Sequence, residues 1–185
     1  MSVLIAARTL GELSGWRLTN LEMHKMLYVA HMLHLGRTGM LLVDEDFEAW
    51  DYGPVLPSLY KAVKNHKHMP ILAFNHVHAF EPGSPERVSI EEAYALTRHL
   101  RPGELIRLTH RDGGAWDANY DGVRRSAKIS TADILAEFEC YMLPSDDAVG
   151  WAEQMADQVA ATPSRYLCGE RKRAFRARVL PGHLH

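Results

Sequence analysis

The chain has 185 residues, of which 46% are hydrophobic and 24% charged, and its formal net charge is −2. This length accommodates one well-buried core and is too short for two ordinary domains, so we expect one domain with an appended tail. The nearly neutral balance excludes a general attraction to nucleic acid or to anionic membranes. An electrostatic partner would have to bind a local patch.

The cysteines and the start of the chain predict a cytoplasmic location. Cys140 and Cys168 form no disulfide framework in a chain of this size, which is typical of a reducing compartment. The apolar run over residues 3–7 has no basic segment before it and is too short for a signal peptide. No apolar stretch approaches the roughly 20 residues of a membrane-spanning helix, so we expect no membrane partner.

The segment after Thr19 predicts an amphipathic helix. Thr19 and Glu22 fit a capping box, in which the hydroxyl accepts from the amide of Glu22 and the carboxylate accepts from the amide of Thr19. Apolar residues follow at helical spacing over about four turns, and we expect Gly36 and Gly39 to end the helix.

Two short β-prone runs, residues 40–43 and 47–52, are separated by acidic turn residues and predict a small hairpin. At its end, Gly53 can take a positive φ and Pro54 has a fixed φ, so the chain leaves the strand sharply. Trp50 is then held rigidly, together with Tyr52, on one side of the strand. Such an arrangement is typical of a recognition platform and equally of a corner in a core.

The remaining chain predicts helices separated by one long connection, residues 69–86, which is rich in proline. Capping patterns at Ser89, Ser130 and Ser145 mark three of the helix starts. The expected helices cover residues 58–66, 89–100, 104–110, 131–142 and a last segment that Thr162-Pro163 ends.

These elements predict a mainly α-helical, compact domain with a small β-hairpin near residues 40–52. We place the domain at residues 1–144 and a helical, basic C-terminal extension at residues 145–185, packed on the domain or trailing from it. Its cations suit phosphates, an acidic protein surface or a protease, and they also fit a solvated helix end. They are Arg165, Arg171, Lys172, Arg173, Arg176 and Arg178.

Patterns that would carry chemistry are incomplete. Residues 117–122 match the first half of a calcium-binding EF-hand loop, but Arg125 and Lys128 occupy positions nine and twelve, so we expect an Asx turn. His31 and His34 lie one helical turn apart without a third ligand at a recognised spacing. No CxxC pair or Gly-x-Ser-x-Gly motif is present. We expect no catalytic residue, no metal and no cofactor.

Three segments in order carry a resemblance to a known family: Leu21 to Ala30, Phe47 to Val55, and Leu105 to Trp116 with its Leu108-Thr109-His110. They resemble the SocA-like, or Panacea-domain, family of bacterial and phage proteins, and together they cover most of residues 18–142. The resemblance implies a mostly helical antitoxin that neutralises a cognate protein toxin by direct contact. In the SocA branch it also implies a proteolytic adaptor that presents the toxin to the ClpXP protease.

The family resemblance leaves two roles open for the aromatic residues of the motifs, namely core framework or contact surface. On a surface they would be anchors of a protein interface, with basic residues of the tail beside them. The candidate partner-binding residues are Tyr28, Trp50, Tyr52, His110, Trp116, Arg171, Arg173 and Arg176.

Two other classes of function compete with a non-enzymatic antitoxin. A DNA-binding, autoregulating transcription factor is suggested by the capped helix at Thr19 and by the basic C-terminal end, through which nucleic acid would bind. A recognition helix needs several polar or basic side chains on one face, however, and residues 19–35 offer Asn20 and Lys25. The third class is a metal-dependent hydrolase that uses the histidines.

Overall fold

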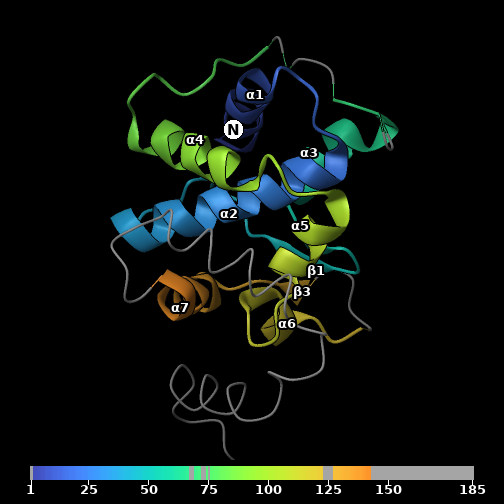
Figure 1. Cartoon of the computed structure of the whole chain (residues 1–185), viewed down its shortest axis with the longest axis vertical. Coiled ribbons are helices and arrows are strands. Elements are labelled where there is room, and N and C mark those ends of the chain that lie inside the picture. The colour runs from blue at the N-terminus through green and yellow to red at the C-terminus, as the bar shows by residue number, and fades with distance from the viewer. Residues whose placement is uncertain (1, 67–68, 72–73, 75, 123–126, 143–185) are drawn as a thin grey trace, which may run out of the picture.

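The computed structural model describes residues 2–66, 69–71, 74, 76–122 and 127–142, and it confirms a mainly α-helical fold with a small antiparallel sheet (Figure 1). The helices are α1 Ser2–Ser14, α2 Asn20–Thr38, α3 Pro57–Val63 with a following 3-10 turn Lys64–His66, α4 Pro85–Thr97, α5 Pro102–Thr109, α6 Ala115–Asn119 and α7 Thr131–Met142. The strands are β1 Glu48–Trp50, β2 Gly53–Val55 and β3 Ala127–Lys128. The predicted extension, residues 145–185, lies outside the described residues.

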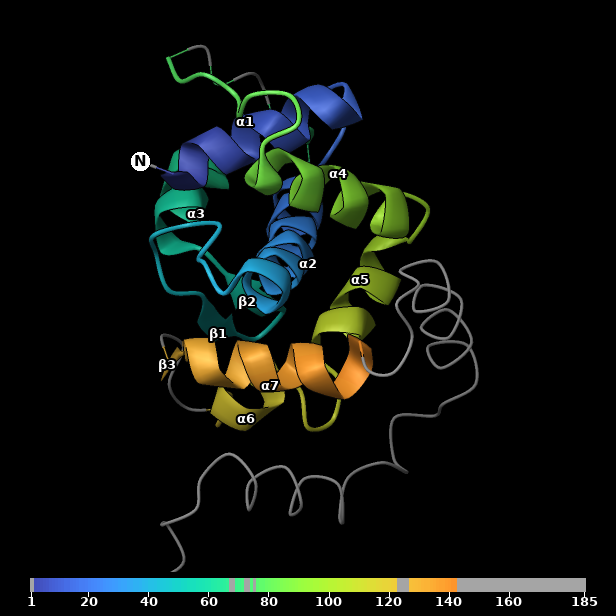
Figure 2. The same ribbon diagram turned by 90° about the vertical axis from the view of Figure 1, so that its left-hand side faces the viewer.

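Helix α2 is the centre around which the other elements pack. Every residue from Met23 to Leu35 is buried, so the helix is enclosed on all sides. In both views α1 and α4 lie on one side of it, whereas α6 and α7 lie on the opposite side (Figures 1 and 2). The predicted capping box at Thr19 is confirmed, and Gly39 ends the helix in the left-handed conformation with φ 71°.

Gly36 does not end α2, and that part of the prediction is wrong. The residue lies inside the helix, where a Cβ atom would come within 2.2 Å of the Phe138 ring. The glycine is needed because the aromatic side chain of α7 packs directly on the backbone of α2. Close packing between these two helices therefore overrides the poor helix propensity of glycine.

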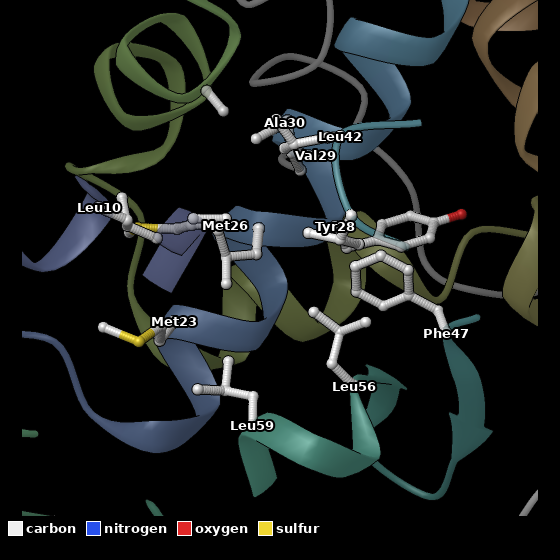
Figure 3. Close-up of a cluster of buried hydrophobic side chains, with 14 of the residues drawn as sticks. Leu10, Met23, Met26, Tyr28, Val29, Ala30, Leu42, Phe47, Leu56 and Leu59 are labelled. Carbon is white, nitrogen blue, oxygen red and sulfur yellow. The ribbon is translucent and has the colours of Figure 1, made fainter. Parts of the chain in front are cut away.

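The hydrophobic core joins α1, α2, α3 and the loop before β1 (Figure 3). Tyr28 and Phe47 meet edge to face with their ring centroids 5.2 Å apart. Leu10, Leu56 and Leu59 each have an exposed fraction of 1% or less. The hairpin is thus anchored to the central helix through the residue that immediately precedes it, Phe47.

The hairpin is displaced from its predicted position. Strand β1 pairs with β2 in the register Glu48 to Val55 and Trp50 to Gly53, and β3 pairs with the other edge of β1. No strand forms over residues 40–43. Leu42 and Val43 are instead buried within a loop, so their apolar character serves the core without β pairing.

Two helix starts also differ from expectation. Helix α1 lies outside the predicted helices, because the apolar run over residues 3–7 was weighed only as a signal peptide. Helix α4 begins one turn before Ser89, with Ser84 as its cap and Pro85 in its first turn. The Ser89 hydroxyl donates to the carbonyl of Pro85 at 2.9 Å and lies 3.1 Å from Nδ1 of His34.

The segment that resembles half an EF-hand is partly helical, because Asp117 and Asn119 belong to α6. The side-chain amide of Asn119 donates to the carbonyl of Ala115 at 2.8 Å and to a carboxylate oxygen of Asp133 at 2.9 Å. The expected Asx turn is therefore replaced by a short helix fastened to α7. Among the described residues, no helix has the length and apolar character needed to cross a membrane.

The contact between Gly36 and Phe138 predicts a stability effect. We expect Gly36→Ala to lower the free energy of unfolding by about 1–3 kcal/mol, because the added methyl group overpacks the site. Gly103→Ala is the matched control, since a Cβ there meets no atom within 4 Å and alanine favours the helix. Chemical denaturation measures both, and a Gly36→Ala variant as stable as the wild type would contradict this packing.

Candidate partner-binding site

A buried lysine lies directly beneath the tip of the hairpin. Lys25 of α2 is 1% exposed, and its Nζ donates a hydrogen bond of 2.9 Å to the carbonyl oxygen of Pro54. Gly53 has φ 98°, and a Cβ at that position would lie 2.8 Å from Nζ of Lys25 and 2.9 Å from Oγ1 of Thr109. Only glycine fits here, because both its backbone conformation and its lack of a side chain are required.

Burial holds the basic groups around this lysine in their neutral forms. It lowers the pKa of Lys25 to about 7. Burial and then the charge of Lys25 lower the pKa of His24 to about 3 and that of His110 to about 4, although a hydrogen bond with the backbone of Tyr52 acts in the opposite direction on His110. Both histidines are therefore uncharged near neutral pH.

An aromatic stack fixes the hairpin from the side of α5 and α6. The ring of Trp116 lies between His110, at a centroid distance of 3.6 Å, and Tyr120, at 4.4 Å. Its Nε1 donates to the carbonyl oxygen of Trp50 at 2.9 Å. The hydroxyl of Tyr120 donates to a carboxylate oxygen of Asp51 at 3.0 Å. The tip of the hairpin is thus held through the backbone carbonyl of Trp50 and through the side chain of Asp51.

The side chain of Trp50 is held by contacts with α3 and with its own strand. Its ring meets Tyr60 of α3 edge to face with a centroid distance of 4.8 Å, and its Nε1 donates to Glu48 at 2.8 Å. Tyr52, in contrast, is 69% exposed at the turn. The hairpin therefore presents one aromatic side chain to solvent from a rigid support.

A surface cleft of about 730 Å³ opens between the first turns of α2 and the hairpin. Its walls are largely apolar and aromatic, which is typical of a binding site. Residues from α2, the hairpin, α3 and α5 line it: Asn20, Leu21, His24, Lys25, Trp50, Asp51, Tyr52, Val55, Tyr60 and Ile106. We call this feature the hairpin cleft.

The structure separates the predicted candidates into three groups. Trp50 and Tyr52 line the hairpin cleft, whereas His110 and Trp116 support the hairpin from behind. Tyr28 is a core residue that offers no surface to a partner, because it is 1% exposed. Arg171, Arg173 and Arg176 lie outside the described residues.

Tyr28 takes part in a buried polar network that joins α2 to α7. Its hydroxyl donates to a carboxylate oxygen of Glu137 at 2.6 Å, and the same oxygen accepts from the amide of Ala115 at 2.9 Å. Burial raises the pKa of Glu137, while the nearby charge of Arg111 acts in the opposite direction. The network fixes the start of α6, and thereby Trp116, relative to the core.

The cleft residues on α2, α3 and α5 are not among the site residues predicted from the sequence. Asn20 and His24 lie four residues apart and so share one helical face, a spacing that the sequence contains. Nothing in the sequence pairs them with Tyr60 or Ile106, because only the tertiary fold brings these segments together. Asn20 and Lys25 enter the sequence analysis only as candidate DNA contacts.

The structure bears on part of two alternatives, whereas the basic C-terminal end that one of them also invokes lies outside the described residues. Helix α2 cannot serve as a recognition helix in a DNA groove, because residues 23–35 are buried. His31 and His34 are core residues, 3% and 2% exposed. Within the described part of the chain, no three histidine, cysteine, aspartate or glutamate side chains come together as potential metal ligands.

The lowered pKa of Lys25 predicts a pH-dependent contribution to stability. Its pKa is about 7 in the fold and 10.5 ordinarily, so the unfolded chain binds more protons between these values and stability rises with pH there. We expect the free energy of unfolding of the wild type, minus that of Lys25→Met, to increase by about 1 kcal/mol per pH unit from about pH 7.5 to 9.5. Urea denaturation across this range measures the difference, in which other titrating groups cancel. Equal slopes for the two proteins would contradict the buried, desolvated lysine.

Comparison with known proteins supports a family assignment. Residues 23–117 match the model of the family described as "Antitoxin SocA-like, Panacea domain". The chain is 30% identical over 115 residues to Antitoxin SocA of Caulobacter vibrioides, a region that covers 57% of this chain and 61% of that relative's length. No solved structure matches the chain. Since the family model covers about half of the chain, including most of α2, the hairpin, His110 and Trp116, the chain belongs to the SocA-like antitoxin family that carries the Panacea domain.

Proposed function

We propose that this protein is an antitoxin that neutralises a cognate protein toxin by direct binding at the hairpin cleft, without catalysis. The observation that carries the proposal is the exposed Tyr52 on a braced hairpin beside an apolar cleft. Membership of the SocA-like antitoxin family supports the same role. The antitoxin acts by occupancy, because the bound protein covers a surface that the toxin needs.

The rigidity of the hairpin favours tight binding. Lys25 holds the carbonyl of Pro54, and Trp116 holds that of Trp50, so the tip loses little conformational freedom when a partner binds. Tyrosine and tryptophan dominate the energetics of protein interfaces, because each buries a large area with few rotatable bonds. Tyr52 and the partly buried Trp50 are therefore the proposed anchors.

We extend the proposal to delivery of the bound toxin to the ClpXP protease, a step that rests on the resemblance to the SocA branch alone. The hairpin cleft would hold the toxin, and a different surface would contact the protease. The alternative of a DNA-binding regulator has no comparable support in the described residues, because its proposed recognition helix is the buried centre of the fold.

The proposal predicts that Tyr52→Ala weakens toxin binding about 10- to 100-fold without lowering the melting temperature, because the side chain is exposed and serves only the interface. Met40→Ala is the matched control. Met40 is 66% exposed but follows the opposite end of α2, on the order of 25 Å from the cleft. Titration calorimetry with the protein encoded by the neighbouring open reading frame measures both affinities.

Two results would contradict this function. Equal losses for Tyr52→Ala and Met40→Ala would place the interface elsewhere. A wild-type chain that restores growth to cells producing the toxin, yet never associates with it in a pull-down, would exclude neutralisation by contact.

A further inference from the structure

We propose that the hairpin cleft binds an extended segment of the partner protein through its main chain, with Asn20 and His24 as the hydrogen-bonding groups. This inference rests on the proposed function and specifies the chemistry of the bound segment. It begins from two buried polar atoms in the cleft lining that have no hydrogen-bond partner among the described residues, Oδ1 of Asn20 and Nε2 of His24.

The hydrogen bond made by the other nitrogen of His24 determines what Nε2 can do. Nδ1 accepts from the backbone amide of Leu56 at 3.2 Å, so Nδ1 carries no proton. In the neutral imidazole the proton is then on Nε2, which makes this atom a donor. His24 is 2% exposed, and its Nε2 is a buried N–H for which no described residue supplies an acceptor, which is costly unless a ligand or water supplies one.

Asn20 supplies the opposite polarity one helical turn away. Its Oδ1 is a buried acceptor that lacks a donor. Residues four apart lie on the same face of a helix and are separated by about 6 Å along its axis. Two residues that line the cleft, on one face of α2, thus carry an acceptor and a donor that no described residue satisfies.

An extended polypeptide fits this pair. One edge of an extended strand presents both the N–H and the C=O of the same residue, so it offers a donor and an acceptor to one neighbour. A partner N–H would donate to Oδ1 of Asn20, while a partner C=O would accept from Nε2 of His24.

The remaining cleft residues favour the same occupant over a nucleic acid or a small anion. Side chains of an extended segment would enter between Leu21, Val55 and Ile106, which are apolar. Lys25, the one cation of the lining, is turned beneath Gly53 toward the carbonyl of Pro54. A phosphate or carboxylate would also face the acceptor Oδ1 of Asn20, with which it can form no hydrogen bond.

Paired substitutions test the two groups separately. His24→Asn keeps an acceptor for the amide of Leu56 but is too short to place a donor at the position of Nε2, whereas His24→Gln keeps a donor near that position. Asn20→Asp keeps the acceptor, and Asn20→Leu removes it. With the full-length protein from the neighbouring open reading frame as the probe, we expect His24→Asn and Asn20→Leu each to weaken binding about 10-fold. We expect Asn20→Asp and His24→Gln to bind within about 3-fold of the wild type, with a lower melting temperature for His24→Gln.

The controls separate this inference from the function on which it rests. If the wild type does not bind the probe, the proposed function fails. If the wild type binds and all four variants bind equally well, the proposed function stands and main-chain recognition is overturned. Coupling of the His24→Asn loss to a single polar side chain of the partner in a double-mutant cycle would also overturn it.

A photoreactive residue identifies the occupant directly. With Tyr52→p-benzoylphenylalanine, we expect crosslinks to one continuous run of residues in the toxin. Crosslinks to residues 143–185 of the same chain, or to a second copy, would show a different occupant and contradict the inference.

Discussion

The hydrogen bond from the buried Nζ of Lys25 to the carbonyl of Pro54 is the constraint that fixes the hairpin and the cleft beside it. It joins the central helix to the second strand of the hairpin across 29 residues of sequence. It also explains Gly53, since any larger residue would collide with the lysine. A hydrophobic residue would satisfy the core at lower desolvation cost, so we attribute the lysine to the precise placement of the hairpin.

The same end of the molecule combines a rigidly held hairpin with a cleft whose lining residues carry unpaired polar atoms. On the side of α5 and α6, the stack of His110, Trp116 and Tyr120 holds the Trp116 ring in place, and Nε1 of that ring donates to the Trp50 carbonyl. In the cleft lining, Asn20 and His24 each carry a buried polar atom that has no partner among the described residues. Polar groups inside a fold are normally paired, so a concentration of unpaired groups beside an apolar cleft favours a binding role over a structural one.

Local signals in the sequence predicted the fold better than the site. The capping box at Thr19 and the terminal glycine of α2 depend on neighbouring residues, and both are confirmed. The predicted strand over residues 40–43 does not form. Leu42 and Val43 are apolar because they are buried within a loop. Trp50 and Tyr52 were found from the Gly-Pro corner, but the cleft itself was not, because α2, α3 and α5 meet only through long-range packing.

Hydrogen–deuterium exchange of the antitoxin, free and bound to its toxin, tests the central claim most directly. The account predicts strong protection on binding at the backbone amides of residues 50–53 and at the first turn of α2. It predicts no change around Met40 at the other end of that helix. Protection confined to α4, α7 or the chain after residue 142, with the hairpin unaffected, would contradict it.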